Sequence, residues 1–362
     1  MAALAPVFVS HEVYRCRGYG PQHPLGIARV GTVMDLCAML GWLDASNYRE
    51  SPRASVAQLC RFHAPEYVEA LRRGAASARH NLGTMENPLF PGLFERAATS
   101  VGGSILATQL AAEGRIAFHP AGGTHHGRPD RASGFCYFND PVFAILTLLD
   151  AGLAPLLYVD LDAHHGDGVQ DAFANDERIH TLSIHEAGRW PHTGAAEDSG
   201  GGRSHNLPVP RGFNDSELEF LVDEIVLPLA RRIRPQAVVL TCGADALAGD
   251  PLSAMALSNA ALWSAVERIA ATAPRAVVLG GGGYNPWTVA RYWTGLWGTL
   301  SARAIPAALP EEARAILSRL TCDLVDDEDV RAEWLVGLSD APNPGTIRPQ
   351  VRELVERTHA LA

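Results

Sequence analysis

Between Asp160 and Asp167 the chain carries three carboxylates and two histidines. Asp160, Asp162 and His164 occupy every second position, so on an extended chain their side chains point to the same face. Carboxylates and an imidazole that converge from one face can bind a divalent metal ion. The apolar run before them, 156–159, has the length of a buried strand, and stability alone does not explain so much charge at its end. The spacing therefore predicts a metal site at the end of a strand.

Asp245 is the expected third ligand, because it also follows an apolar run of strand length, 237–240. Asp162, His164 and Asp245 together supply two negative charges and one imidazole. Such a set neutralises a divalent cation and leaves a coordination position open, as catalytic metal sites do. These ligand types suit zinc and iron(II) alike. The alternative interpretation of the cluster is a salt-bridged strand end.

Two adjacent histidines, His125 and His126, follow a Gly-Gly pair and are candidates for proton transfer. Asp160 and Asp167 flank the expected metal ligands without being needed for coordination. A hydrogen bond from His125 to Asp160, and another from His126 to Asp167, would fix each tautomer and raise the basicity of each ring. An imidazole held in this way suits a general base that activates a water molecule. Without that context, two surface histidines would be the simpler interpretation.

Tyr284 follows four consecutive glycines, Gly280 to Gly283. Glycines permit close approach of the backbone to other groups, so this turn leaves room around the tyrosine. Its phenol could donate a hydrogen bond to the oxyanion of a tetrahedral intermediate. A phosphate-binding glycine loop and a simple tight turn are the alternatives.

The elements that must position these residues alternate along the chain. Apolar runs of strand length occur at 5–10, 116–118, 156–159, 180–184, 237–240 and 276–279. Helical patterns occur at 31–40, 65–73, 93–110, 141–150, 258–271 and 310–320, and a further helix is expected from a capping box of Ser216 and Glu219 to just before Pro235. Such alternation predicts a parallel sheet with helices on both faces and a site at the carboxyl ends of its strands.

Composition narrows the class of protein. The 362 residues are 47% hydrophobic and carry a formal net charge of −10, which argues against a nucleic-acid-binding surface. The N-terminus lacks the pattern of a signal peptide, and no window has the length and apolarity of a membrane span. The six cysteines form no Cys-x-x-Cys pair, as expected in a reduced compartment. We therefore expect a cytoplasmic protein with one domain over 1–362, in which 298–362 is peripheral packing or an oligomer contact; the oligomeric state is not predicted.

Five segments in order resemble the zinc-dependent histone deacetylase family, and more narrowly its class I-like bacterial histone deacetylase-like and acetoin-utilisation members. They are Pro120 to His126, Ser133 to Asp140, Tyr158 to Gly168, Cys242 to Asp245 and Gly280 to Tyr284. The similarity extends from about His11 to Trp297. It implies an arginase-like α/β fold of three layers around an eight-stranded, mostly parallel sheet. It also implies zinc on Asp162, His164 and Asp245, acid–base catalysis by His125 and His126, and Tyr284 as the partner of the oxyanion.

The same resemblance implies a tunnel for an acyl-lysine side chain. Phe135 and Trp190 would be its facing aromatic walls, with Gly134 and Gly282 beside them. Glu86 occupies the place of a rim carboxylate that is usually Asp and that holds the substrate backbone. Without the resemblance, ordinary core or loop packing would explain the two aromatic residues and the two glycines.

Two positions near the expected tunnel differ from other members of the family. Leu252 stands where acetylpolyamine-selective relatives carry a glutamate, which argues against a polyamine substrate. Pro251 stands where class I eukaryotic enzymes carry an arginine, which argues against regulation by inositol phosphate through a corepressor. The resemblance also implies a potassium site, partly of backbone carbonyls, and the alternative for it is a well-bonded strand turn. Its residues are Asp160, Asp162, His164, Ser183 and Ile184.

These observations predict a metal-dependent amidohydrolase that removes acetyl or another small acyl group from an amine, first of all from an acylated lysine of a protein or peptide. A small acylated amine such as an acetylpolyamine is the alternative substrate. An arginase-type ureohydrolase would need a second metal, which the Asp-Ala-His-His-Gly-Asp sequence at 162–167 does not provide in the Asp-Ala-His-Ala-Asp form. A non-catalytic acyl-amine binder is the third alternative.

Overall fold

The computed structural model describes residues 4–16 and 18–360. Within these residues, eight parallel strands form one sheet in the order β2-β1-β3-β8-β7-β4-β5-β6. The strands are β1 (Val7–Ser10), β2 (Tyr48–Glu50), β3 (Ile116–His119), β4 (Leu156–Asp160), β5 (Ile179–Glu186), β6 (Ser204–Val209), β7 (Ala237–Thr241) and β8 (Ala276–Leu279). The predicted α/β fold is confirmed, and every strand pair in the sheet is parallel.

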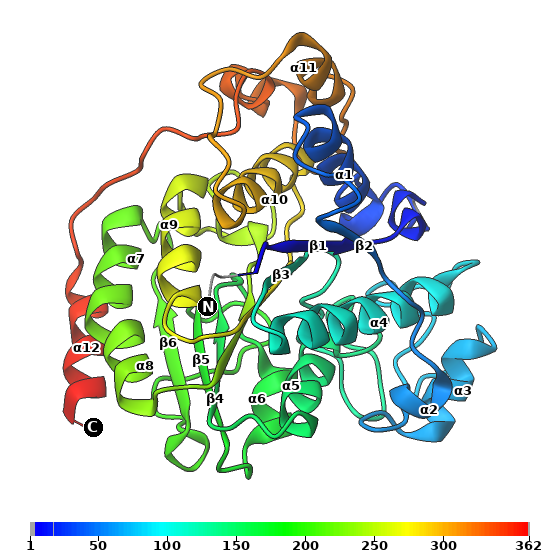
Figure 1. The fold of residues 1–362 in the computed structure, drawn as a ribbon, viewed down its shortest axis with the longest axis vertical. Helices are drawn as coiled ribbons and strands as arrows, with labels where there is room; N and C mark the ends of the chain where they lie inside the picture. The colour runs from blue at the N-terminus through cyan, green and yellow to red at the C-terminus, as the bar shows by residue number, and fades with distance from the viewer. Residues whose placement is uncertain (1–3, 17, 361–362) are drawn as a thin grey trace.

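Strand β4 shows why these segments are buried on both faces of the sheet. Leu157 and Val159 point into the main core, whereas Leu156 and Tyr158 point into a second core on the opposite face. Helices cover both faces, which gives three layers (Figure 1). On the main-core face lie α1 (Val30–Met39), α7 (Asp215–Leu221), α8 (Leu227–Ile233), α9 (Asn259–Ala270) and α10 (Pro286–Leu300); on the other lie α4 (Leu93–Ala112), α5 (Asp140–Asp150) and α6 (Asp167–Phe173).

Two strands and one helix boundary differ from the sequence analysis. Strands β2 and β6 have no continuous apolar run of strand length, because β2 is a three-residue edge strand and β6 begins with three polar residues, Ser-His-Asn. The capping box of α7 is formed by Asn214 and Glu217 rather than Ser216 and Glu219. Both pairs have the right spacing, but Glu217 is buried and its carboxylate also binds the Arg348 guanidinium.

The chain after α10 contributes to the main core. Leu317, Trp334, Leu338 and Val355 are buried there, along with other apolar side chains of the last sixty residues. This part contains α11 (Glu311–Leu317) and α12 (Pro349–Ala360), and α12, which the sequence analysis did not predict, packs beside α7 and β6 (Figure 1). The short helices α2 (Val56–Leu59) and α3 (Pro65–Arg72) pack in a third apolar cluster. Among the described residues, no helix combines the length and apolarity needed to cross a lipid bilayer.

Candidate active site

The expected metal ligands meet because β4 and β7 are neighbours in the sheet. Asp160 at the end of β4 lies opposite Thr241 at the end of β7, and the two loops that follow leave the same edge. Asp162 and His164 come from the first loop and Asp245 from the second. Parallel strands therefore bring together ligands that are about eighty residues apart in the sequence.

Asp162, His164 and Asp245 form a buried cluster with the geometry of a metal site. Each offers one ligand atom, and these atoms all lie within 4.8 Å of one another. The Nδ1 atom of His164 is 3.2 Å from Oδ1 of Asp162 and 3.0 Å from Oδ2 of Asp245. The two aspartates are 1% and 0% exposed, so two buried carboxylates face a single imidazole. Burial of a carboxylate pair is costly unless a cation offsets the charge.

The pKa of His164 reports the same charge imbalance. Burial opposes protonation of this imidazole, but hydrogen bonds and the charges of Asp162 and Asp245 outweigh it and raise the pKa to about 10. The cluster thus attracts positive charge strongly. One imidazole nitrogen and two carboxylate oxygens are the donors that zinc and iron(II) accept in proteins, so these residues fit a divalent metal.

Glycines allow the backbone to approach these carboxylates closely. The N–H of Gly282 donates to Oδ2 of Asp162 at 2.6 Å, and a Cβ on Gly282 would lie 2.0 Å from Oδ2 of Asp245. A Cβ on Gly243 would lie 2.2 Å from Oδ2 of Asp162. Gly282, expected beside the tunnel, instead supports the ligand carboxylates and is not among the residues that line the cavity. Any larger residue at either position would push a ligand away.

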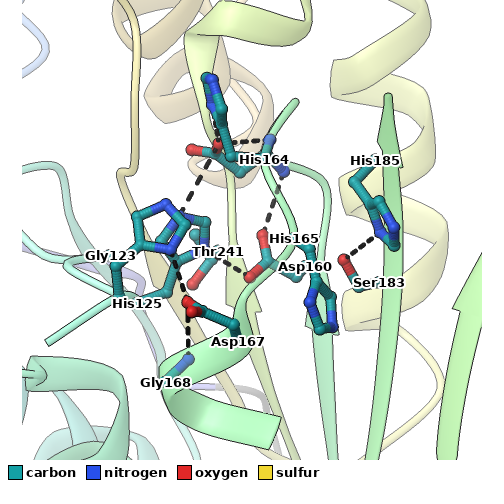
Figure 2. A network of polar contacts seen from close by, with 12 residues as sticks. Gly123, His125, Asp160, His164, His165, Asp167, Gly168, Ser183, His185 and Thr241 are labelled. Carbon is teal, nitrogen blue, oxygen red and sulfur yellow. Dashed lines mark hydrogen bonds and ion pairs between the residues drawn. The ribbon is translucent and has the colours of Figure 1, made fainter. Parts of the chain in front are cut away.

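His125 and His126 each contact the aspartate that the sequence analysis paired with them. Nδ1 of His125 lies 2.7 Å from Oδ2 of Asp160, and Nδ1 of His126 lies 2.7 Å from Oδ1 of Asp167. Figure 2 shows His125, Asp160 and Asp167 gathered beside the ends of the strands. Each imidazole therefore keeps its Nε2 atom for other partners. The ring centroids of the two histidines are only 3.9 Å apart.

The two histidines differ in charge because their surroundings differ. Burial opposes protonation of His125, but the negative charges of Asp160 and Asp162 outweigh it and raise its pKa to about 9. Burial and the positive charge of His125 lower the pKa of His126 to about 3. Arg128 forms an ion pair with Asp167, so that carboxylate is already partly neutralised. The surroundings therefore shift the pKa values of the two neighbouring imidazoles in opposite directions.

The residues of the expected potassium site lie on β4, β5 and the loop after β4. Asp160 is in register with Ser183, and Ile184 follows Ser183 on β5. Oδ1 of Asp160 accepts a hydrogen bond from the N–H of Asp162 at 3.1 Å, and Oδ2 accepts one from the Tyr158 hydroxyl at 2.6 Å. Ser183 is 2.9 Å from Nδ1 of His185 (Figure 2). Asp160 and Ser183 thus lie side by side at the ends of β4 and β5, next to the loop that carries Asp162 and His164.

His165, for which the sequence suggested no role, belongs to a buried polar network. Its Nδ1 atom lies 2.8 Å from the Thr193 hydroxyl and its Nε2 atom 3.0 Å from Oε1 of Gln170. Both ring nitrogens are therefore used within the protein. Figure 2 shows the His165 ring pointing away from that of His164.

A cavity of about 640 Å³ opens above the metal cluster. His126, His164 and Tyr284 line it, and so do five of the residues expected to contact substrate: Glu86, Gly134, Phe135, Trp190 and Leu252. The Phe135 ring centroid is 5.9 Å from that of Tyr284, and the Trp190 centroid is 4.6 Å from that of His126. A Cβ on Gly134, whose φ is +53°, would lie 2.3 Å from the Trp190 ring. Two aromatic rings and a glycine thus form part of the cavity wall next to His126 and Tyr284.

A histone deacetylase domain model matches residues 23–300. The chain belongs to the histone deacetylase family. A relative in Schizosaccharomyces pombe, histone deacetylase clr6, is 36% identical over 308 residues, which are 81% of this chain and 76% of that protein. Human histone deacetylase 1 is 34% identical over 81% of this chain, but the match spans only 64% of the human protein.

Solved structures of the histone deacetylase family also match. The crystal structure of a homologue from Aquifex aeolicus has a TM-score of 0.93 and 32% identity, and the match covers 98% of this chain and 99% of that one. A structure of a homologue in complex with SAHA has the same TM-score, identity and coverage. The arginase/deacetylase-like fold is therefore shown over 98% of the chain.

Several residues around this histone deacetylase-family site were missed by the sequence analysis. Asp250 is buried, and its Oδ2 accepts a hydrogen bond from the N–H of Tyr284 at 2.7 Å. The partly buried Arg29 guanidinium donates to the carbonyl of Gly281 and lies 4.9 Å from the Trp293 ring. A second cavity is lined by Arg29, Gly281 and Phe135, among others. No local pattern marked these residues, because their partners are distant in the sequence.

Proposed function

We propose that this chain is a metal-dependent amidohydrolase that removes acetyl or another small acyl group from the Nε atom of an acylated lysine. The observation that carries the proposal is the buried Asp162–His164–Asp245 cluster at the base of a cavity that His126 and Tyr284 also line. Membership of the histone deacetylase family and the SAHA complex of a structural relative support the same substrate class.

The proposed metal is zinc, with iron(II) as the alternative, held by Asp162, His164 and Asp245. When bound there, such an ion would act as a Lewis acid toward the oxygen of the acyl carbonyl. A potassium ion on Asp160, Asp162, His164, Ser183 and Ile184 is proposed as a structural cofactor. It would offset part of the negative charge below the catalytic cluster.

In the proposed mechanism, proton transfer falls to the histidine pair. His126 lines the cavity and uses Nδ1 for Asp167, so its Nε2 can accept a proton from the attacking water. Asp167 holds that ring in the required orientation, and Asp160 does the same for His125. The protonated pair then returns a proton to the leaving amine. The lowered pKa of His126 keeps this ring available as the proton acceptor.

Tyr284 is proposed to stabilise the oxyanion. Its ring reaches the cavity between Phe135 and His164, with centroids 5.9 Å and 6.5 Å away. Burial, and the charges of Asp245 and Asp162, raise the pKa of its phenol well above the usual value. The phenol therefore remains protonated and can donate a hydrogen bond where negative charge develops.

The walls of the channel suit the aliphatic part of a lysine side chain. Phe135 and Trp190 offer aromatic faces, and Leu252 adds an apolar side chain at the mouth. Leu252 supplies no charge there for a second ammonium group, which favours a lysine over a polyamine. We also propose a cytoplasmic location, because all six cysteines are free thiols, as in a reducing compartment.

The test is turnover by protein that has been stripped of metal with a chelator and then reloaded with zinc. Acetyl-lysine, propionyl-lysine and butyryl-lysine peptides serve as substrates, with acetylspermidine as the small-amine comparison. The proposal predicts zinc-dependent release of the acyl group from at least one lysine peptide. A zinc-loaded protein that hydrolyses none of the lysine peptides would contradict it.

A further inference from the structure

The mouth of the cavity carries a cation whose charge the protein does not balance. Arg211 lines the cavity, and its side chain is 77% exposed. The nearest carboxylate among the described residues is that of Glu186, whose Oε1 lies 3.9 Å from Nη1 of Arg211. That separation is too long for a hydrogen bond. Arg211 therefore has a charged neighbour but no bonded partner in this arrangement.

Three closer donors already occupy most of the acceptor positions of the Glu186 carboxylate. Arg189 donates to it through Nε, 2.5 Å from Oε2, and through Nη2, 2.8 Å from Oε1. The backbone N–H of Ala254 donates to Oε2 at 2.7 Å. Because the single charge of Glu186 is matched by Arg189 in a bidentate pair, the charge of Arg211 remains in excess. Nη1 of Arg189 also donates a hydrogen bond to the carbonyl of Leu252 at 2.9 Å, and both residues line the cavity.

The backbone that carries Arg211 is held in place. Nη1 of Arg348 donates to the Arg211 carbonyl at 2.6 Å, and the N–H of Gly212 donates to the Ala254 carbonyl at 2.6 Å. Arg348 is itself neutralised by Glu217, which accepts from its Nε and Nη2 atoms. The C-terminal segment thus holds the backbone of Arg211 without adding net charge. The Arg211 guanidinium remains free to bind a ligand.

Glu86 provides a different kind of contact at the same mouth. Its Oε2 accepts from the side-chain amides of Asn81 and Asn87, at 2.8 Å and 3.0 Å, and its Oε1 accepts from the N–H of Gly134 at 3.1 Å. A carboxylate has about four acceptor positions, so about one remains for a substrate N–H. The mouth therefore presents one acceptor beside Gly134 and one guanidinium beside the Glu186–Arg189 pair.

We propose that Arg211 is a specificity residue that binds a carboxylate of the substrate while the acyl-lysine side chain occupies the cavity. A guanidinium pairs with a carboxylate in a planar, bidentate geometry that an ammonium group or an amide does not reproduce. The carboxylate is either the α-carboxylate of a free or C-terminal acyl-lysine or the side chain of a neighbouring Asp or Glu. This inference rests on the proposed function, because it names the substrates that the same site prefers.

Four substrates test the proposal and separate the two sources. Nα-acetyl-Nε-acetyl-lysine is compared with its C-terminal amide, and an amidated acetyl-lysine peptide with a neighbouring Glu is compared with its Gln counterpart. The zinc-loaded enzyme is expected to show a kcat/KM about five- to tenfold higher for at least one carboxylate member of a pair, mainly through KM. The preference should decline with added salt, since the guanidinium is exposed.

Substitutions at Arg211 test whether this residue causes the preference for a carboxylate. Arg211→Gln should remove it and leave kcat/KM for the amide substrates within about twofold, and Arg211→Lys should restore only part of it. Arg231→Gln is the matched control, because Arg231 is exposed and lines a different cavity. Equal turnover within both pairs by the wild type, or equal loss on all four substrates in Arg211→Gln, would overturn the inference while the proposed function stands. No hydrolysis of any substrate by the zinc-loaded wild type would overturn both.

Discussion

The carboxylate of Asp250 joins Tyr284 to the wall of the cavity. One oxygen accepts a hydrogen bond from the backbone N–H of Tyr284 at 2.7 Å, and the other accepts one from the backbone N–H of Leu252 at 2.9 Å. The thiol of Cys322, from the C-terminal segment, lies 3.6 Å from the Tyr284 carbonyl. The proposed oxyanion donor is thus held through its backbone by residues that do not reach the substrate.

Asp250→Asn should weaken catalysis through the position of Tyr284. The amide keeps one acceptor oxygen but turns an N–H₂ group toward a backbone N–H, so one of the two hydrogen bonds is lost. We expect kcat to fall by about tenfold or more, with a smaller change in KM, because the loss affects the transition state more than binding. Steady-state kinetics with an acetyl-lysine peptide measure this, and zinc content and melting temperature serve as controls. An unchanged kcat would show that Tyr284 is positioned without Asp250.

Gly282→Ala should reduce metal binding. The added Cβ would lie 2.0 Å from Oδ2 of Asp245, so either the ligand or the backbone must move. We expect less than half of the wild-type zinc per chain after dialysis against a weak chelator, measured by elemental analysis. Gly20→Ala is the matched control, because a Cβ there would meet nothing within 4 Å. Wild-type zinc content in Gly282→Ala would contradict the geometry described for the ligands.

Metal should stabilise the folded chain. The two buried carboxylates of Asp162 and Asp245 face one imidazole, and a ligand that binds only the native state raises its stability by mass action. We expect the melting temperature to fall by several degrees on chelation and to recover with zinc. Asp245→Asn should abolish the difference between the zinc-loaded and stripped forms. A melting temperature that does not respond to zinc in the wild type would argue against a site at this cluster.

His63 should make the fold sensitive to acid. Its Nδ1 lies 2.9 Å from the Arg128 carbonyl, and its Nε2 accepts a hydrogen bond from the N–H of Asn139, so the ring is needed in its neutral form. Burial lowers the pKa of His63 to about 4. The unfolded chain, with a histidine pKa of about 6.5, binds a proton first, so the stability contribution is complete above that pH and is lost as pH falls toward 4. The loss is on the order of 2–3 kcal/mol.

Denaturant unfolding at pH 7 and pH 4.5 measures this effect. His63→Gln retains an acceptor oxygen for the Asn139 N–H but does not titrate. The variant should therefore lose less stability between the two pH values than the wild type does. An equal loss in both proteins would assign the acid sensitivity to other groups.

The sequence predicted the parts of the molecule whose signals are local. Apolar runs that end in charge placed β4 and β7, and with them Asp162, His164 and Asp245. Strand β2 was missed because its three residues, none of them buried, carry no apolar pattern.

Local patterns could not predict contacts between segments that are distant in the sequence. Asp250 meets Tyr284 from 34 positions away, and Arg348 holds the Arg211 carbonyl from 137 positions away. In the sequence, Asp250, Arg211 and Arg348 each resemble an ordinary surface or loop residue. Only the fold shows that they adjoin the cavity.

The most direct test of the account is the turnover number of His126→Ala and Tyr284→Phe on an acetyl-lysine peptide, measured with zinc bound. His126 is the proposed base and Tyr284 the proposed oxyanion donor, and neither is a metal ligand. We predict that each variant retains about one zinc per chain and that kcat falls by about a hundredfold or more. Zinc-loaded variants that turn over the peptide at the wild-type rate would contradict the proposed function of this site.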